Sequence, residues 1–306
     1  MPRRPAFRAG TASIIGLPNA GKSTLLNALV GEKLAIVSSK PQTTRTALDG
    51  VLTTPAAQIV FVDTPGIHKS DTPYNQKMMR SVRASLDAID VLVFVHDAQR
   101  VISTEVEGAL DLVKKAGVPA ILVLNKIDLV EDRQKVLGLL AQFPKYHEFA
   151  AYVPVSAQTG EGVETVRDEI IKLLPRVPKI YPEDHITQMP SRFLAAEIIR
   201  EKILAATHQE VPHAVAVLVE TWEETPKLTR ISATIYVERQ GQKTIVIGQK
   251  GAGLKAIGTA ARLEMEEFFG TKIFLELFVK VRPDWRNQPE FLNELDWRRM
   301  TGERDE

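Results

Sequence analysis

Four short motifs occur in order in the first half of the chain, and each follows a run of apolar residues. They are GLPNAGKS at 16–23, DTPG at 63–66, NKID at 125–128 and SAQ at 156–158. The first has the pattern of a phosphate-binding loop, which needs a strand before it and a helix after it. Loops at the carboxyl ends of parallel strands meet at one edge of a sheet. The motifs therefore predict an α/β domain that holds one nucleotide.

Apolar runs alternate with segments of helical period from residue 11 to residue 174, which is typical of a mostly parallel sheet with helices on both faces. The connection at Thr54–Ala56 is too short for a crossover helix, so it predicts a hairpin and one antiparallel strand. Strands are expected at 11–15, 47–54, 57–62, 91–96, 119–124 and 152–155, and helices near 22–30, 74–86, 103–116, 131–141 and 162–173.

A second domain follows a stretch that contains Pro175, Pro178 and Pro182, which favour an extended linker over 175–186. We expect a flexible N-terminus at 1–10, a first domain at 11–174, a small α+β domain at 187–282 and a C-terminal tail at 283–306. In the α+β domain, helices are expected at 191–206, 243–247 and 252–269, and strands at 213–222, 229–238 and 272–281.

Composition excludes several kinds of protein. The 306 residues suit two domains, and the formal net charge of +1 means that any anion-binding surface must be local. The chain has no Cys, which excludes disulfides, thiol catalysis and Cys-based zinc sites. No apolar run reaches the roughly 18 residues that span a bilayer. The basic start MPRRPAFRAG lacks the apolar segment of a signal peptide.

The phosphate-binding loop lies at the start of a predicted helix, where backbone amides favour an anion. We expect Lys22 to bridge the β- and γ-phosphates and Ser23 to bind Mg²⁺ through its hydroxyl. An ordinary Gly-rich turn is the structural alternative. The loop residues expected at the nucleotide are Gly16, Leu17, Pro18, Asn19, Ala20, Gly21, Lys22, Ser23 and Thr24.

The DTPG motif ends the apolar run QIVFVD. Asp63 is placed to hold Mg²⁺ through water, and the Gly66 amide to contact a γ-phosphate and lose it on hydrolysis. Thr64 and Pro65 complete this nucleotide-binding loop. The structural alternative is an Asp-capped turn before a helix.

Two further features concern the reaction itself. In PQTTR at 41–45, Thr43 or Thr44 should complete the Mg²⁺ shell, and we favour Thr44. Ile67 follows DTPG, where many GTPases place a Gln that orients the attacking water, so slow hydrolysis is expected. The role of His68 stays open. The residues expected to act on the reaction are Lys22, Thr44 and Gly66.

The NKID and SAQ motifs predict the choice of base. A carboxylate at Asp128 can accept hydrogen bonds from guanine N1–H and the 2-amino group, which adenine does not offer in that arrangement. Lys126, after Asn125, would lay its stem along the base. The Ala157 amide, after Ser156, is placed to donate to guanine O6. GTP is therefore favoured over ATP, which argues against a metabolic kinase.

A GXXG loop occurs in the second domain at 248–251, between two predicted helices. KH domains use such a loop to clamp a nucleic-acid backbone, although a simple tight turn is the alternative. Residues 239–263 carry five basic residues and no acid, which indicates a local basic stripe. The residues expected to bind RNA are Gly248, Gln249, Lys250, Gly251, Lys243, Lys255 and Arg262.

With these motifs the chain resembles the Era family of bacterial GTPases over nearly all its length. The resemblance rests on GxPNxGKST, QTTR, VDTPGIH, NKID and SAQTG, and then on YPEDxIT, FLAAEIIREKI, VIGQKGAGLKAIG and LFVKVRPDWR. It implies a Ras-like G domain that binds GTP or GDP with Mg²⁺ and hydrolyses GTP slowly without a partner. A type II KH domain that binds RNA would follow.

The resemblance also implies partners. Members of the family bind the 3′ end of small-subunit rRNA and assist 16S rRNA processing and maturation of the 30S subunit. A cytoplasmic monomer with some peripheral membrane contact is expected. Asn19 matches a residue that ligates K⁺ in related GTPases. Ile67 matches the apolar residue that members of the family carry in place of the catalytic Gln. Two hypotheses stay open: a GTP-dependent switch that controls RNA binding, or an RNA-binding assembly factor whose nucleotide is mainly structural.

Overall fold

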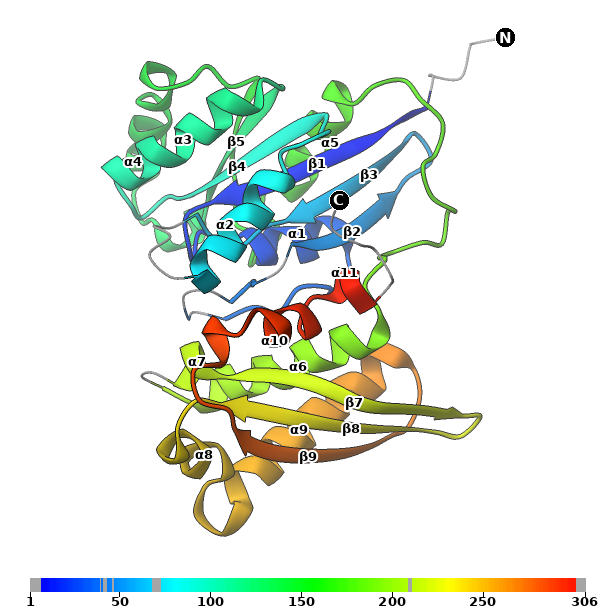
Figure 1. Ribbon diagram of the computed structural model, residues 1–306. Coiled ribbons are helices and arrows are strands. Elements are labelled where there is room, and N and C mark those ends of the chain that lie inside the picture. Colours follow the sequence, from blue (N-terminus) through cyan, green and yellow to red (C-terminus); the bar gives the residue numbers. More distant parts are fainter. Residues whose placement is uncertain are drawn as a thin grey trace. The chain divides into compact units, whose positions relative to one another are not determined.

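The computed structural model describes residues 7–38, 40, 43–45, 47–67, 73–208 and 211–300. The chain forms two compact units, one of Met1–Asp71 and Asn75–Gln188 and the other of Thr72–Tyr74 and Met189–Glu306 (Figure 1). The expectations for residues 1–6, Pro41, Gln42, His68 and 301–306 lie outside the described residues. Among the described helices, none has both the length and the apolar character that a membrane crossing requires.

The first unit is built on a six-stranded sheet with the order β2-β3-β1-β4-β5-β6. Only the β2–β3 pair is antiparallel, so the fold class and the hairpin expected from the sequence are confirmed. The strands are β1 (Arg8–Gly16), β2 (Leu48–Thr53), β3 (Ala57–Asp63), β4 (Val91–Asp97), β5 (Ala120–Asn125) and β6 (Ala151–Pro154).

Helices cover both faces of this sheet (Figure 1). Every residue of β4 and β5 is buried, as expected for parallel strands between two helical layers. A hydrophobic cluster joins β1, β4 and β5 to α2, α3 and α4. The helices are α1 (Lys22–Val30), α2 (Pro73–Ala84), α3 (Thr104–Ala116), α4 (Arg133–Leu140) and α5 (Val163–Leu173), with short 3₁₀ turns η1 (Ile127–Leu129) and η2 (Phe143–Lys145).

The ends of the first unit differ from the sequence expectation. Strand β1 begins at Arg8, which pairs with Ala57 of β3, so residues 8–10 belong to the sheet and not to a flexible terminus. After α5, the Pro-rich segment lies along the sheet edge: the Val51 amide of β2 donates to the Ile186 carbonyl at 2.7 Å. The buried Gln58 Oε1 accepts from the amides of Ile180 (2.7 Å) and Tyr181 (2.9 Å).

The second unit has a three-stranded sheet in the order β7-β8-β9, with β7–β8 antiparallel and β8–β9 parallel. Strand β7 begins at Ala216 and not at 213, because residues 211–214 form the short helix α7. Helices α6 and α9 pack together, α6 against β7 and α9 against β9. The elements are α6 (Ser191–Ala206), α7 (Val211–Ala214), β7 (Ala216–Thr225), β8 (Leu228–Val237), α8 (Gln240–Ile247), η3 (Gln249–Gly251), α9 (Ala252–Phe269) and β9 (Ile273–Val281).

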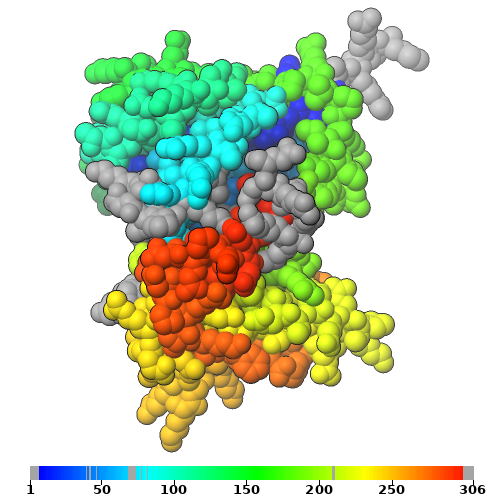
Figure 2. Space-filling view, in the orientation of Figure 1, coloured from blue at the N-terminus to red at the C-terminus, as the bar shows by residue number. Residues whose placement is uncertain are grey.

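Residues 283–300, expected as part of a tail, are packed and partly helical. They form η4 (Trp285–Asn287), α10 (Pro289–Glu294) and α11 (Trp297–Met300). The fully buried Trp285 donates its indole N–H to the Ala214 carbonyl at 2.9 Å. The Phe291 ring lies edge-on to Tyr236 with centroids 4.8 Å apart. Figure 2 shows this segment, in orange to red, as a continuous patch on the face in view.

Candidate functional site

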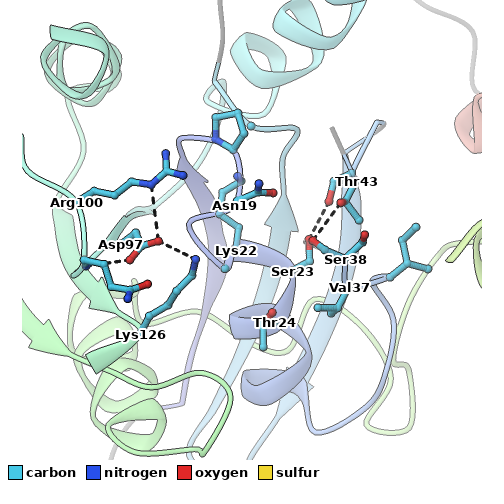
Figure 3. Close-up of a pocket in the computed structure, with 16 residues that line it drawn as sticks. Asn19, Lys22, Ser23, Thr24, Val37, Ser38, Thr43, Asp97, Arg100 and Lys126 are labelled. Atoms are coloured by element: carbon cyan, nitrogen blue, oxygen red, sulfur yellow. Dashed lines mark hydrogen bonds and ion pairs between the residues drawn. The ribbon is translucent and has the colours of Figure 1, made fainter. Parts of the chain in front are cut away.

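The first unit contains a pocket of about 630 Å³ at the carboxyl ends of its parallel strands (Figure 3). Its wall combines the loops that follow β1, β3, β4 and β5, as expected for a ligand site in an open α/β sheet. The lining residues are Pro18, Asn19, Gly21, Lys22, Ser23, Thr24, Ile36, Val37, Ser38, Thr43, Thr44, Gly66, Asp97, Gln99, Arg100 and Lys126.

Three oxygen-bearing side chains predicted to hold Mg²⁺ come together at this pocket. The Ser23 hydroxyl donates to Asp63 Oδ2 at 2.7 Å, and Thr44 Oγ1 lies 2.8 Å from Ser23 Oγ and 3.3 Å from Asp63 Oδ2. Asp63 is fully buried, and its Oδ1 has no hydrogen-bond partner among the described residues. A buried carboxylate oxygen without a donor calls for a partner that the side chains do not supply, and a bound cation fits this position.

This donor set suits Mg²⁺, which prefers hard oxygen ligands and is often bound by one carboxylate together with substrate phosphates. Among the described residues, no group of three His, Cys, Asp or Glu side chains offers an all-protein metal site. Thr43 also lines the pocket, but its hydroxyl donates to the Lys40 carbonyl at 2.6 Å, whereas the Thr44 hydroxyl contacts Ser23 and Asp63. The geometry thus favours Thr44 over Thr43 as the switch-loop ligand.

Lys22 is buried at the base of the phosphate-binding loop. Its Nζ donates to the Leu17 carbonyl at 3.2 Å, so the ammonium lies against the loop that would surround a β-phosphate. Burial lowers the pKa of Lys22 and raises that of Asp63, while the opposite charge of each group opposes the shift of the other. A phosphate and a cation in the pocket would relieve both desolvation costs.

The DTPG loop packs directly on the phosphate-binding loop. The Ile67 amide donates to the Gly16 carbonyl at 3.1 Å, and the Thr64 hydroxyl donates to the Ile14 carbonyl at 2.9 Å. A Cβ at Gly66 would lie 2.8 Å from Pro18 Cα, so only glycine permits this approach. The Ile67 side chain is buried in the hydrophobic cluster and does not line the pocket.

Asn125 joins two of the motif loops. Its Nδ2 donates to the Ala20 carbonyl at 2.9 Å, and its Oδ1 accepts from the Ala157 amide at 3.0 Å. The Ala157 amide, expected to donate to guanine O6, is therefore engaged by Asn125 and would have to share its proton. Ser156 is buried, and its hydroxyl accepts from the Thr159 amide at 3.2 Å.

Asp128 lies in η1, is exposed to solvent and is not part of the pocket wall. Its carboxylate makes no hydrogen bond or ion pair with another described residue, so all its acceptor sites are available. Residues predicted for the nucleotide that also lie outside the wall are Gly16, Leu17, Ala20, Asp63, Thr64, Pro65, Asn125, Ser156 and Ala157.

The sequence prediction missed six residues of the pocket: Ile36, Val37, Ser38, Asp97, Gln99 and Arg100. Asp97 ends β4 and pairs with Lys126 at 2.7 Å. The sequence could have indicated Asp97, because it ends a buried strand at the same sheet edge as Asp63 and Asn125.

The second unit has a groove of about 410 Å³ beside the GXXG loop. Gly251, Lys255 and Arg262 line it, whereas Gly248, Gln249, Lys250 and Lys243 do not. Gly248 has φ 71°, and a Cβ there would lie 2.8 Å from the Gly253 nitrogen. The exposed Lys250 also has a positive φ of 49°, so the turn presents its side chain to solvent.

The basic stripe is weaker than the sequence indicated. Arg262 pairs with Glu266 at 2.9 Å, one helical turn beyond the acid-free stretch. The Ile273 amide, together with Lys272 and Arg262, lowers the pKa of the Glu266 carboxyl. Glu266 therefore offsets part of the charge of Arg262. Among the Lys and Arg side chains predicted to bind RNA, Lys243, Lys250 and Lys255 have no such acidic partner in the described part of the chain.

Comparisons with known proteins agree on both units. A family model described as "50S ribosome-binding GTPase" matches residues 11–126, and a KH domain model matches residues 210–286. The GTPase Era of Syntrophus aciditrophicus is 48% identical over 293 residues, which is 95% of each chain. That of Geobacter metallireducens is 46% identical and covers 95% of this chain and 98% of its own.

A solved structure of Era in complex with MgGDPNP and nucleotides 1506–1542 of 16S ribosomal RNA superimposes with a TM-score of 0.92 and 39% identity. The match covers 95% of this chain and 99% of that one. The prediction of a G domain followed by a KH domain is thereby confirmed, and the chain belongs to the Era family of GTPases.

Proposed function

We propose that this GTPase is a switch that binds small-subunit rRNA near its 3′ end and assists 16S rRNA processing and 30S subunit biogenesis. The observation that carries the proposal is the meeting of Ser23, Thr44 and Asp63 beside the buried Lys22, because it links a switch-loop hydroxyl to the phosphate site. The GXXG groove on the same chain, and the RNA held by the related Era structure, support rRNA as the partner.

The chain's own residues divide the work on the nucleotide. Lys22 would hold the β- and γ-phosphates, and Ser23, Thr44 and Asp63 would hold Mg²⁺. When bound, Mg²⁺ would neutralise charge on the phosphate oxygens. The Gly66 amide is proposed to contact the γ-phosphate, so the loops that carry Thr44 and Gly66 would lose contacts on hydrolysis. Asp128 is proposed to select guanine, with Ala157 donating to O6.

The second candidate is an RNA-binding assembly factor whose nucleotide is mainly structural. The burial of Ile67 in the apolar cluster favours it, because the apolar Ile67 side chain cannot orient the attacking water and hydrolysis would be slow. The two candidates differ in whether nucleotide state changes RNA affinity.

An RNA titration decides between them. Full-length protein loaded with GDP or with GDPNP would be titrated with a labelled single strand of the 16S rRNA 3′ end. The switch predicts affinities that differ by about fivefold or more, the usual lower range of coupling between two sites. Equal affinities would favour the structural role of the nucleotide.

Potassium should accelerate GTP hydrolysis relative to sodium. We propose that Asn19, which lines the pocket with a left-handed φ of 62°, supplies an oxygen ligand to K⁺ beside the phosphates. A cation there would stabilise charge that develops in the transition state, so an effect of about tenfold or more is expected. Turnover would be measured in KCl and NaCl at equal ionic strength, with Asn19→Ala losing the difference. Equal wild-type rates in the two salts would contradict the assignment.

A cytoplasmic monomer with peripheral membrane contact is proposed on the family resemblance alone.

A further inference from the structure

Asp97 is a buried carboxylate in the pocket that none of the four motifs contains. It is the last residue of β4, and its side chain is only 7% exposed. Oδ2 lies 2.7 Å from Lys126 Nζ, an ion pair drawn in Figure 3. Oδ1 accepts from the Gln99 amide at 3.0 Å. The two carboxylate oxygens thus have different tasks, one within its own loop and one toward the NKID loop.

The backbone around this pair is fixed from both sides. Asp97 is the register partner of Asn125, and the Ala98 amide donates to the Asn125 carbonyl at 2.8 Å. Lys126 follows with φ 67° and ψ 35°, a left-handed conformation that is uncommon outside glycine. The ammonium of Lys126 is held by Asp97 while its side chain, 28% exposed, still lines the pocket.

We propose that Asp97 is a positioning residue for the nucleotide base. It holds the Lys126 ammonium so that the aliphatic stem already lies along the base site before the nucleotide binds. The inference rests on the proposed function, in which Lys126 flanks the base that Asp128 reads. Asp97 itself would touch no part of the nucleotide and would act only through Lys126.

Preorganisation sets the size of the effect. Holding the Lys126 side chain in advance removes part of the entropy cost of ordering it when the nucleotide binds. We expect the loss of this hold to raise the dissociation constant about tenfold, which is about 1.4 kcal/mol. The Arg100 guanidinium, 3.9 Å from the same Oδ2 and 57% exposed, is too distant for a hydrogen bond and does not replace Lys126. Contact between the Lys126 stem and the base does not depend on the 2-amino group of guanine. The loss of affinity should therefore be equal for GDP and for inosine diphosphate (IDP), which lacks that group.

The substitution Asp97→Asn separates the two oxygens of this carboxylate. An Asn keeps an acceptor for the Gln99 amide but removes the charge that holds Lys126. We expect GDP to bind about tenfold more weakly, mainly through faster dissociation, with the ratio of GDP to IDP affinity unchanged. Lys126→Met, which keeps an apolar stem without the ammonium, should show a similar loss.

The double variant gives the decisive result. If Asp97 acts through Lys126, then Asp97→Asn costs less than about twofold in the Lys126→Met background. An undiminished tenfold loss in that background, or no loss in the single variant, would overturn the proposal. Thermal unfolding would identify variants that are merely destabilised. Asp111→Asn removes an exposed carboxylate paired with Lys114 at 3.4 Å and is the matched control, expected to bind GDP normally.

The same titrations keep this proposal separate from the guanine contact. Failure of the Asp128 contact would appear as an unchanged ratio of GDP to IDP affinity in Asp128→Asn. Failure of the Asp97 proposal would appear in the coupling between positions 97 and 126.

Discussion

Replacing Asp128 with Asn should weaken GDP and GTP binding by roughly two to four orders of magnitude. Hydrogen bonds to a charged group contribute about 1.5–3 kcal/mol each, and two would be lost or mismatched. The exposed carboxylate of Asp128 has no competing partner among the described residues, so its full acceptor capacity would be available to the base that it is proposed to bind. An amide would instead donate to a 2-oxo group, so xanthosine diphosphate should gain affinity.

Fluorescent-nucleotide competition with GDP and xanthosine diphosphate would measure both changes. Asp132→Asn is the matched control, because Asp132 caps α4 by accepting from the Gln134 amide at 2.8 Å, and Asn caps helices equally well. Wild-type affinity for GDP in Asp128→Asn, without a gain for the xanthine nucleotide, would remove Asp128 from the base site.

Local motifs predicted the phosphate site because their chemistry is carried by contiguous residues. The meeting of Ser23 with Asp63 was readable, since each lies at the carboxyl end of a buried parallel strand or just after it. The part of the pocket wall formed by Ile36, Val37 and Ser38 could not be predicted from the sequence. That segment has no regular period and reaches the pocket only through the tertiary path of its loop.

In the fold, too, local patterns predicted some elements, whereas others depend on tertiary contacts. Strands β4 and β5 were predicted because buried parallel strands are continuous apolar runs. The course of residues 175–188 depends instead on polar side chains that are distant in the sequence. Asp49 of β2, for example, accepts through Oδ2 from the Gln188 amide at 2.8 Å. Burial raises the pKa of the Asp49 carboxyl, although this hydrogen bond and that from Thr187 oppose the shift.

Short helices were missed for a related reason. The elements η4 and α11 have three and four residues, too few for a 3.6-residue period to appear. These two elements are held in place by the buried side chains of Trp285 and Trp297, and that burial requires the rest of the second unit. A sequence reading sees two isolated tryptophans and cannot tell a packed segment from a loose tail.

Gly248→Asp should reduce RNA binding to background, and Lys250→Asp should weaken it by at least about tenfold, while GTP affinity stays unchanged. The GXXG loop must let a phosphate backbone approach its own backbone closely. An acidic side chain repels phosphate at either position, and at Gly248 it also fills the space of approach. Titration of the single-stranded 16S rRNA 3′ end, with a duplex of the same sequence beside it, would measure the loss.

The two substitutions differ in their effect on the fold, which makes the pair informative. Gly248→Asp introduces a Cβ 2.8 Å from the Gly253 nitrogen at φ 71°, so local strain contributes to its effect. Lys250 is exposed with φ 49°, and Asp tolerates that conformation better than Lys does, so its substitution changes charge without strain. A loss of RNA affinity in Lys250→Asp therefore does not come from backbone strain.

Salt dependence adds a second measurement of the same contact. Each phosphate contact to a single strand contributes about 0.7 to the slope of log affinity against log salt, so the slope should fall by at least that amount in Lys250→Asp. The matched control for Lys250→Asp is Lys227→Asp, in the exposed turn between β7 and β8. The matched control for Gly248→Asp is Gly138→Asp on α4, where an added Cβ would meet no atom within 4 Å. Because they carry the same new charges away from the loop, a comparable loss in the controls would mean that net charge, and not the GXXG loop, governs binding. Wild-type affinity in both loop variants, or an equal preference for the duplex, would contradict the KH site.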